Sequence, residues 1–238
     1  RSEGKRPKIV YTIPTFQNPQ GMTMTLERRE QVLRVCERQG VPILEDDCYV
    51  DLRFEGDSPP AIRSLDESGL VAYVGSFSKT VAPGLRMGYL TASRELLDRA
   101  RVVKGGAGVN QFAALAIHRY ANTHLDRHVA EINGALRRKR DAMLAALGEN
   151  FGSQGSWNSP DGGLYLWLQM PEGADLAAVL PAALEADVGY QPGTVFSPDG
   201  ASGANCVRLC YGYNTVDEIH EGIARLAEVF ARAGILVG

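Results

Sequence analysis

Two serines, a lysine and an arginine lie close together after the apolar run Val71–Val74. They are Ser76, Ser78, Lys79 and Arg86, with a Pro-Gly turn between the lysine and the arginine. Hydroxyl groups and a guanidinium suit a phosphate monoester, because they combine small donors with a planar, charged fork. The neighbouring amine can form an imine with an aldehyde on the molecule that carries the phosphate. This combination predicts an anchor for pyridoxal 5′-phosphate (PLP).

Two earlier apolar runs also end in polar groups that suit this chemistry. The run Lys8–Ile13 leads to Asn18. The run Val41–Leu44 leads to Asp46 and Tyr49. In an open parallel sheet, ligands bind beyond the carboxyl ends of the strands. If these runs are neighbouring strands, the sequence predicts one site built from three strand ends.

Four motifs in this order give the chain a family resemblance. They are Tyr11–Gly21 (YTIPTFQNPQG), Glu45–Tyr49 (EDDCY), Ser76–Lys79 with Pro83–Tyr89 (SFSK and PGLRMGY), and Asn205–Leu209 (NCVRL). The chain resembles the class I and II aminotransferases of PLP fold type I, and within them the branch of 2-aminoadipate and kynurenine aminotransferases. The resemblance runs from about Pro7 to the C-terminal helix.

The resemblance implies an α/β fold with a mainly parallel sheet. Residues 1–123 are expected to form the C-terminal part of a large PLP-binding domain, and residues 124–238 a connecting helix and a smaller α+β domain. Members of the family carry a further portion before the Asn18 motif, which includes part of the phosphate site. We therefore expect residues 1–238 alone to bind PLP weakly or not at all, to catalyse no measurable transamination, and to be prone to aggregate.

The resemblance also implies roles around the cofactor ring. Lys79 would carry the cofactor as a Schiff base and move the substrate proton. Asp46 would pair with the ring nitrogen and keep it protonated. The family spacing places this aspartate three residues before Tyr49, which disfavours Glu45 and Asp47. Asn18 and Tyr49 would hydrogen-bond the phenolic oxygen of the ring.

The phosphate and the substrate would be held by other residues. Ser76, Ser78 and Arg86 would bind the phosphate. Arg208 alternates with Val207 and Leu209 along a predicted strand, so it faces away from them. That spacing alone also suits a surface arginine, but the resemblance favours a role for Arg208, with Asn18, in binding the substrate carboxylate.

The predicted function is transfer of an amino group between an amino acid and a 2-oxo acid. Two alternatives share the same anchoring residues. One is a PLP-dependent lyase of the same fold, because these residues serve several reactions. The other is the effector domain of an aminotransferase-like transcription regulator, in which a DNA-binding domain would precede the chain.

Composition limits the remaining classes. With 238 residues, 45% of them hydrophobic, the chain can bury a substantial core. A net charge of -3 gives no electrostatic reason to expect nucleic acid or membrane partners. His124 and His128 lack an acidic residue in the metalloprotease position, so no metal is expected. The four cysteines lack a paired motif and favour a cytoplasmic protein. The resemblance implies a homodimer.

The pattern predicts the elements that would position these groups. Thr25 and Gly40 suit the two ends of a helix that runs to about Gln39. The other predicted helices are Glu95–Lys104, Asn110–Tyr120, Leu125–Leu147, Leu176–Glu185 and Val216–Ala231, and the other predicted strands are Met87–Thr91, Gly162–Leu168 and Cys206–Tyr211.

Overall fold

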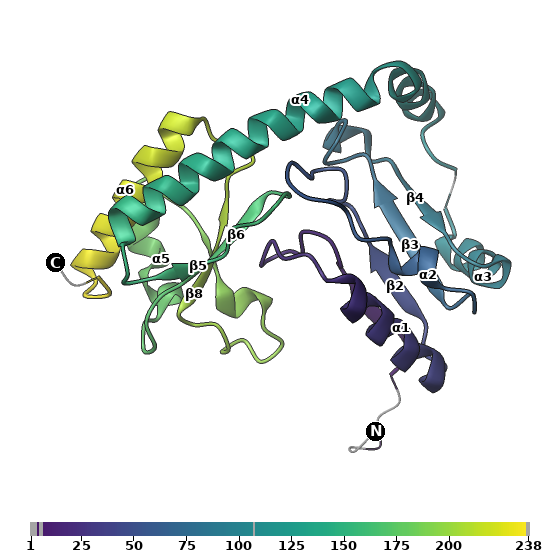
Figure 1. Cartoon of the computed structure of the whole chain (residues 1–238), viewed down its shortest axis with the longest axis horizontal. Helices are drawn as coiled ribbons and strands as arrows, with labels where there is room; N and C mark the ends of the chain where they lie inside the picture. The colour runs from purple at the N-terminus through teal and green to yellow at the C-terminus, as the bar shows by residue number, and fades with distance from the viewer. Residues whose placement is uncertain (1–3, 5–6, 107, 237–238) are drawn as a thin grey trace. The chain divides into compact units, whose positions relative to one another are not determined.

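The computed structural model describes residues 4, 7–106 and 108–236 (Figure 1). The ends of both expected domains, at residues 1–3 and 237–238, lie outside the described part. The chain divides into two compact units. Unit 1 comprises Arg1–Thr15 and Thr23–Ile132, and unit 2 comprises Phe16–Met22 and Asn133–Gly238.

A four-stranded sheet forms the centre of unit 1, in the order β1-β2-β3-β4. Strands β1 (Val10–Thr12), β2 (Ile43–Asp46) and β3 (Val71–Ser76) are parallel, as predicted. Strand β4 (Gly88–Thr91) runs antiparallel to β3. The connection between them, which includes the short helix η1 (Pro83–Leu85), is too short for a parallel crossover.

Helices α1 (Leu26–Gln39), α2 (Ile62–Leu65) and α3 (Arg94–Lys104) complete this part of unit 1. The predicted ends of α1 are confirmed. The Thr25 side chain accepts a hydrogen bond from the Arg28 backbone N–H, and Gly40 adopts the left-handed conformation. In Figure 1, α1 lies in purple alongside β2.

The sheet of unit 1 has one buried face and one open face. Ile43 and Val71 point to the buried face, where they pack with residues of α1 and α2. Each such side chain stabilises the fold by about 1.5–3 kcal/mol. The opposite face carries the half-buried residues Leu44, Asp46, Ala72, Val74 and Ser76 and the exposed residue Tyr11. The open face therefore presents the polar groups of the predicted site.

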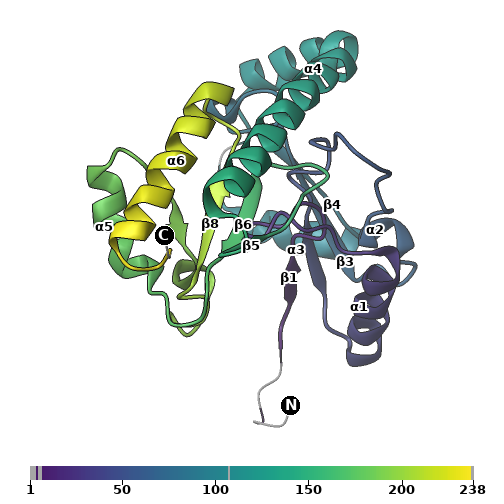
Figure 2. The same ribbon diagram turned by 60° about the vertical axis from the view of Figure 1, so that its left-hand side comes forward.

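Unit 2 contains an antiparallel sheet in the order β5-β6-β8-β7. The strands are β5 (Ser156–Trp157), β6 (Tyr165–Gln169), β7 (Gln191–Pro192) and β8 (Cys206–Cys210). Helices α5 (Leu176–Glu185) and α6 (Val216–Arg232) lie side by side next to this sheet, and η2 (Gly193–Phe196) follows β7 (Figure 2).

Alternate residues along the strands of this second sheet differ in their burial. Leu166, Leu168, Val207 and Leu209 are buried, whereas Arg208 is half-buried. The prediction that Arg208 faces away from Val207 and Leu209 is therefore confirmed.

Helix α4 is one continuous element, Gln111–Phe151, of 41 residues. The sequence pattern predicts two separate helices in this region, with an interruption at about residues 121–124, and that interruption is wrong. Asn122 and Thr123 are weak helix formers, but no proline or glycine breaks the chain there. Adding residues to an existing helix is favourable, so the helix continues through them.

Candidate active site

The predicted site residues fall into two groups. Asn18 and Arg208 belong to unit 2, and the other six belong to unit 1. These six are Asp46, Tyr49, Ser76, Ser78, Lys79 and Arg86.

The three consecutive acidic residues at the end of β2, Glu45, Asp46 and Asp47, have different environments. Asp46 lies on the open face, where its Oδ2 accepts a 2.7 Å hydrogen bond from the Tyr11 hydroxyl. Glu45 is fully buried on the other face and accepts 2.8 Å hydrogen bonds from the backbone N–H groups of Ile62 and Arg63. Asp47 is only 3% exposed. Of the three carboxylates, Asp46 is thus the one that a ligand on the open face can reach.

Lys79 and Tyr49 lie near one another in unit 1. The Lys79 Nζ is 6.0 Å from the centroid of the Tyr49 ring. Tyr49 is buried, which fixes its ring, and Lys79 is exposed. Within the part of the chain that the structure describes, Lys79 forms no ion pair. Its amine is therefore available to a ligand.

Cys48 precedes Tyr49 in the sequence, and its side chain is a neutral thiol. Burial, followed by the charge of Asp46, raises the pKa of Cys48 to about 12. The thiol is therefore protonated near neutral pH and adds no negative charge beside Asp46.

The connection between β3 and β4 carries the hydroxyl groups and the guanidinium. The Ser76 Oγ accepts a 3.1 Å hydrogen bond from the Ser78 backbone N–H. Arg86 has a left-handed backbone, with φ of 51°, and its Nη1 donates to the Pro83 carbonyl oxygen at 3.3 Å. Among the described residues, Arg86 forms no ion pair. The connection thus offers donors without a competing carboxylate, which suits a dianion such as phosphate.

The Arg208 side chain in unit 2 lies among aromatic rings. Its guanidinium carbon is 4.3 Å from the centroid of Tyr165 and 5.1 Å from that of Phe196. Its Nη1 donates a 2.8 Å hydrogen bond to the Asn18 Oδ1. The buried Nε has no hydrogen-bond partner among the described residues. A buried, unpaired donor on a fixed guanidinium suits a carboxylate ligand.

A close approach of the backbone holds the Asn18 loop in unit 2. A Cβ atom on Gly21 would lie 2.3 Å from the Tyr165 carbonyl oxygen, and its φ of 68° is left-handed. The Asn158 Nδ2 donates a 2.6 Å hydrogen bond to the Gln20 carbonyl oxygen. Position 21 therefore requires glycine, and the loop that carries Asn18 is fixed to β6 at this point.

Sequence reasoning missed three residues that contact the predicted site residues. They are Tyr11, Tyr165 and Phe196. Tyr11 and Tyr165 lie in predicted strands, so alternation could have shown which face each one shares. Nothing in the pattern around Phe196 indicates its contact with Arg208.

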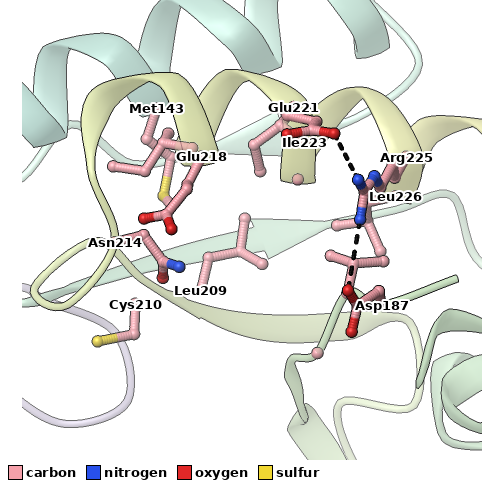
Figure 3. Close-up of a pocket in the computed structure, with 14 residues that line it drawn as sticks. Met143, Asp187, Leu209, Cys210, Asn214, Glu218, Glu221, Ile223, Arg225 and Leu226 are labelled. Atoms are coloured by element: carbon pink, nitrogen blue, oxygen red, sulfur yellow. Dashed lines mark hydrogen bonds and ion pairs between the residues drawn. The ribbon is translucent and has the colours of Figure 1, made fainter.

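A separate pocket of about 350 Å³ lies in unit 2 (Figure 3). Its lining includes Asp187 and Glu221, which both pair with Arg225. None of the predicted site residues lines it. Across residues 4, 7–106 and 108–236, no helix is long and apolar enough to cross a membrane, and no acidic, histidine or cysteine group is clustered for a metal ion.

Comparison with known proteins assigns the chain to a family. Residues 2–226 match the family described as Aminotransferase class I and II. The chain belongs to this family. The resemblance seen in the sequence is therefore confirmed, and so is the fold type I class, because solved aminotransferases superpose on nearly the whole chain.

Three relatives illustrate the range of the family. Aromatic-amino-acid aminotransferase 1 of Thermococcus litoralis is 38% identical over 95% of this chain and 55% of its own length. The kynurenine aminotransferase structure from Pyrococcus horikoshii, in complex with PMP, has a TM-score of 0.93 and 36% identity, over 98% of this chain and 58% of its own. The Bacillus subtilis protein named as the uncharacterized HTH-type transcriptional regulator YisV is 32% identical over 94% of this chain and 46% of its own length. The chain spans about half the length of the curated relatives it matches.

Proposed function

We propose that this chain supplies part of the active site of a PLP-dependent aminotransferase, which moves an amino group between an amino acid and a 2-oxo acid. The observation that carries the proposal is the grouping of Lys79, Tyr49 and Asp46 at the strand ends of unit 1, with the Lys79 amine 6.0 Å from the Tyr49 ring. A lysine without an ion pair among the described residues, near a carboxylate on an open sheet face, fits a cofactor that offers an aldehyde and a basic ring nitrogen.

The residues of unit 1 fit PLP in their chemistry. Asp46 would accept a hydrogen bond from the ring nitrogen, and Tyr49 would donate to the phenolic oxygen. Ser76, Ser78 and Arg86 would hold the phosphate, since they bring donors and one positive charge. When bound, the cofactor supplies an electron sink for the pair released at the substrate Cα.

Lys79 would act as the residue that moves the proton. An amine at this position can attach the cofactor through its aldehyde and, once free, serve as a general base at the substrate Cα. Its exposed side chain has the freedom that both roles need.

Arg208 and Asn18 would bind the substrate. The unpaired Nε of Arg208 would donate to the α-carboxylate, while the Tyr165 and Phe196 rings keep the guanidinium in place. Asn18, which already accepts from Arg208, would also donate to the phenolic oxygen of the cofactor.

We further propose that the protein is a cytoplasmic homodimer. The family resemblance supports the dimer, and the four free thiols support a reducing compartment. Sedimentation of the purified protein and fractionation of the source cells would test these two points.

The test of the function is the half-reaction with a single amino acid. The gene product that carries this chain is loaded with PLP and mixed with individual amino acids, and the cofactor is then analysed by chromatography. Conversion of PLP to pyridoxamine phosphate, with release of the matching 2-oxo acid, is the expected result. Release of a different product with PLP retained would make the protein a lyase. PLP binding without conversion by any amino acid would favour an effector domain of a regulator and would contradict the proposal.

A further inference from the structure

Tyr11 stands beside Asp46 on the open face of the unit 1 sheet. Strands β1 and β2 are parallel, and Tyr11 pairs with Leu44 across them. Alternate residues of a strand share a face, so Leu44 and Asp46 project to the same side as Tyr11. The register of β1 against β2 thus brings a phenol from one strand to a carboxylate two positions along the next.

The contact between the two side chains is direct. The Tyr11 hydroxyl donates a 2.7 Å hydrogen bond to the Asp46 Oδ2. Partial burial, followed by this hydrogen bond and the charge of Asp46, raises the pKa of Tyr11. The phenol therefore keeps its proton at neutral pH and remains a donor to the carboxylate.

The hydroxyl of Tyr11 is the group that contacts Asp46. The Tyr11 side chain is 57% exposed, whereas Leu44, which pairs with it, and Ala72 and Val74 of β3 on the same face are half-buried. An aliphatic side chain would cover this face equally well, but it could not donate to Asp46. The phenol group is thus what distinguishes Tyr11 from its neighbours.

A donor at this distance restricts the carboxylate. An aspartate at the end of a strand can turn about its side-chain bonds, and a hydrogen bond to one oxygen limits that rotation. A hydrogen bond to a charged acceptor is also stronger than one between neutral groups. Tyr11 therefore restricts the orientation in which Asp46 meets a ligand on the open face.

We infer that Tyr11 is a positioning residue, which holds the Asp46 carboxylate toward the ring nitrogen of the cofactor. The inference rests on the proposed function, because it requires PLP in the site. Loss of the phenol should change the state of the ring nitrogen and the turnover rate. Binding of the substrate carboxylate should change little, since that is assigned to Arg208.

The test uses the substitution Tyr11→Phe, which removes the hydroxyl and keeps the ring. The PLP-loaded gene product is prepared with PLP labelled with ¹⁵N at the ring nitrogen, and the ¹⁵N resonance is recorded for wild type, Tyr11→Phe and Asp46→Asn. We expect the resonance of Tyr11→Phe to move from the wild-type position toward that of Asp46→Asn. We also expect kcat to fall about tenfold, the size of a lost hydrogen bond to a charged group, with KM for the amino donor changed less than about twofold.

The matched control is Tyr190→Phe, which removes a hydrogen bond of the same 2.7 Å length, from Tyr190 to the Leu176 carbonyl oxygen in unit 2. Its ¹⁵N resonance should stay at the wild-type position. An unchanged resonance in Tyr11→Phe, or a shift away from the Asp46→Asn position, would overturn the inference while leaving the proposed function intact. A wild-type protein that binds no PLP would overturn both.

Discussion

Replacing Arg208 with alanine should weaken the binding of every amino acid substrate, whatever its side chain. The guanidinium is held by two rings and by the Asn18 Oδ1, at 2.8 Å, so its position does not depend on the substrate. The α-carboxylate is the group that all amino donors share. A residue that binds this group affects all of them alike.

The size of the effect follows from the contacts. The Nε of Arg208 is buried and lacks a partner among the described residues, so a bound carboxylate would meet it away from bulk water. Losing one side of a buried, hydrogen-bonded charge pair costs about 2–5 kcal/mol. Since each factor of ten corresponds to about 1.4 kcal/mol, kcat/KM should decrease by a factor of between about 30 and several thousand. Arg208→Lys keeps the charge without the planar fork and should fall between wild type and Arg208→Ala.

The assay is kcat/KM for monocarboxylic, dicarboxylic and aromatic amino donors with a common 2-oxo acid. Arg225→Ala is the control, because it removes an arginine of the same unit whose ion pairs with Asp187 and Glu221 are exposed to solvent. That variant should stay within about twofold of wild type. A loss confined to dicarboxylic donors in Arg208→Ala would refute the reasoning and make Arg208 a reader of the substrate side chain.

Two further predictions concern stability. Burial raises the pKa of Glu45 in the folded protein above its ordinary value of 4.5. The unfolded chain thus releases this proton first as pH rises. The stability of wild type relative to Glu45→Gln, measured in urea titrations, should therefore fall as the pH rises above about 4.5. A difference that grows with pH would contradict this. Gly21 and Gly40 both have a left-handed backbone conformation, so replacing Gly40 with alanine should cost about 1 kcal/mol of stability. Gly21→Ala should destabilise the protein by clearly more, because only there would a Cβ meet backbone, at 2.3 Å from the Tyr165 carbonyl oxygen. Equal melting temperatures for the two variants would show that the loop gives way.

The elements that position the site could be predicted where local chemistry decides them. Helix α1 has a capping threonine at one end and a glycine at the other, and both act as the pattern indicates. The face of Arg208 also followed from alternation within one strand. The break predicted near Asn122 failed because it rested on weak propensity, and helix propagation outweighs that.

The contacts between strands could not be predicted in the same way. Alternation shows which face Tyr11 occupies, but its hydrogen bond to Asp46 depends on the register of β1 against β2. The contact between Tyr165 and Arg208 depends likewise on the pairing of β6 with β8. Register is set by packing across the whole sheet, which a single strand sequence does not contain.

A buried arginine shows the same limit. Arg29 lies on α1 four residues before Leu33 and seven before Cys36, and like these two residues it is buried. Its Nη2 donates to the Pro14 carbonyl oxygen at 3.1 Å and to the Thr15 hydroxyl at 3.0 Å. These carbonyl and hydroxyl partners come from a loop that is distant in the sequence, so the helical pattern alone gives no sign of them.

The identity of the lysine that holds the cofactor tests the central claim most directly. The PLP-loaded gene product is reduced with borohydride, digested, and analysed by mass spectrometry for the lysine that carries the phosphopyridoxyl group. We predict that the group is on Lys79, and that Lys79→Ala shows no trapped adduct and no turnover. An adduct on another lysine, such as Lys104, or one that persists in Lys79→Ala, would contradict the account.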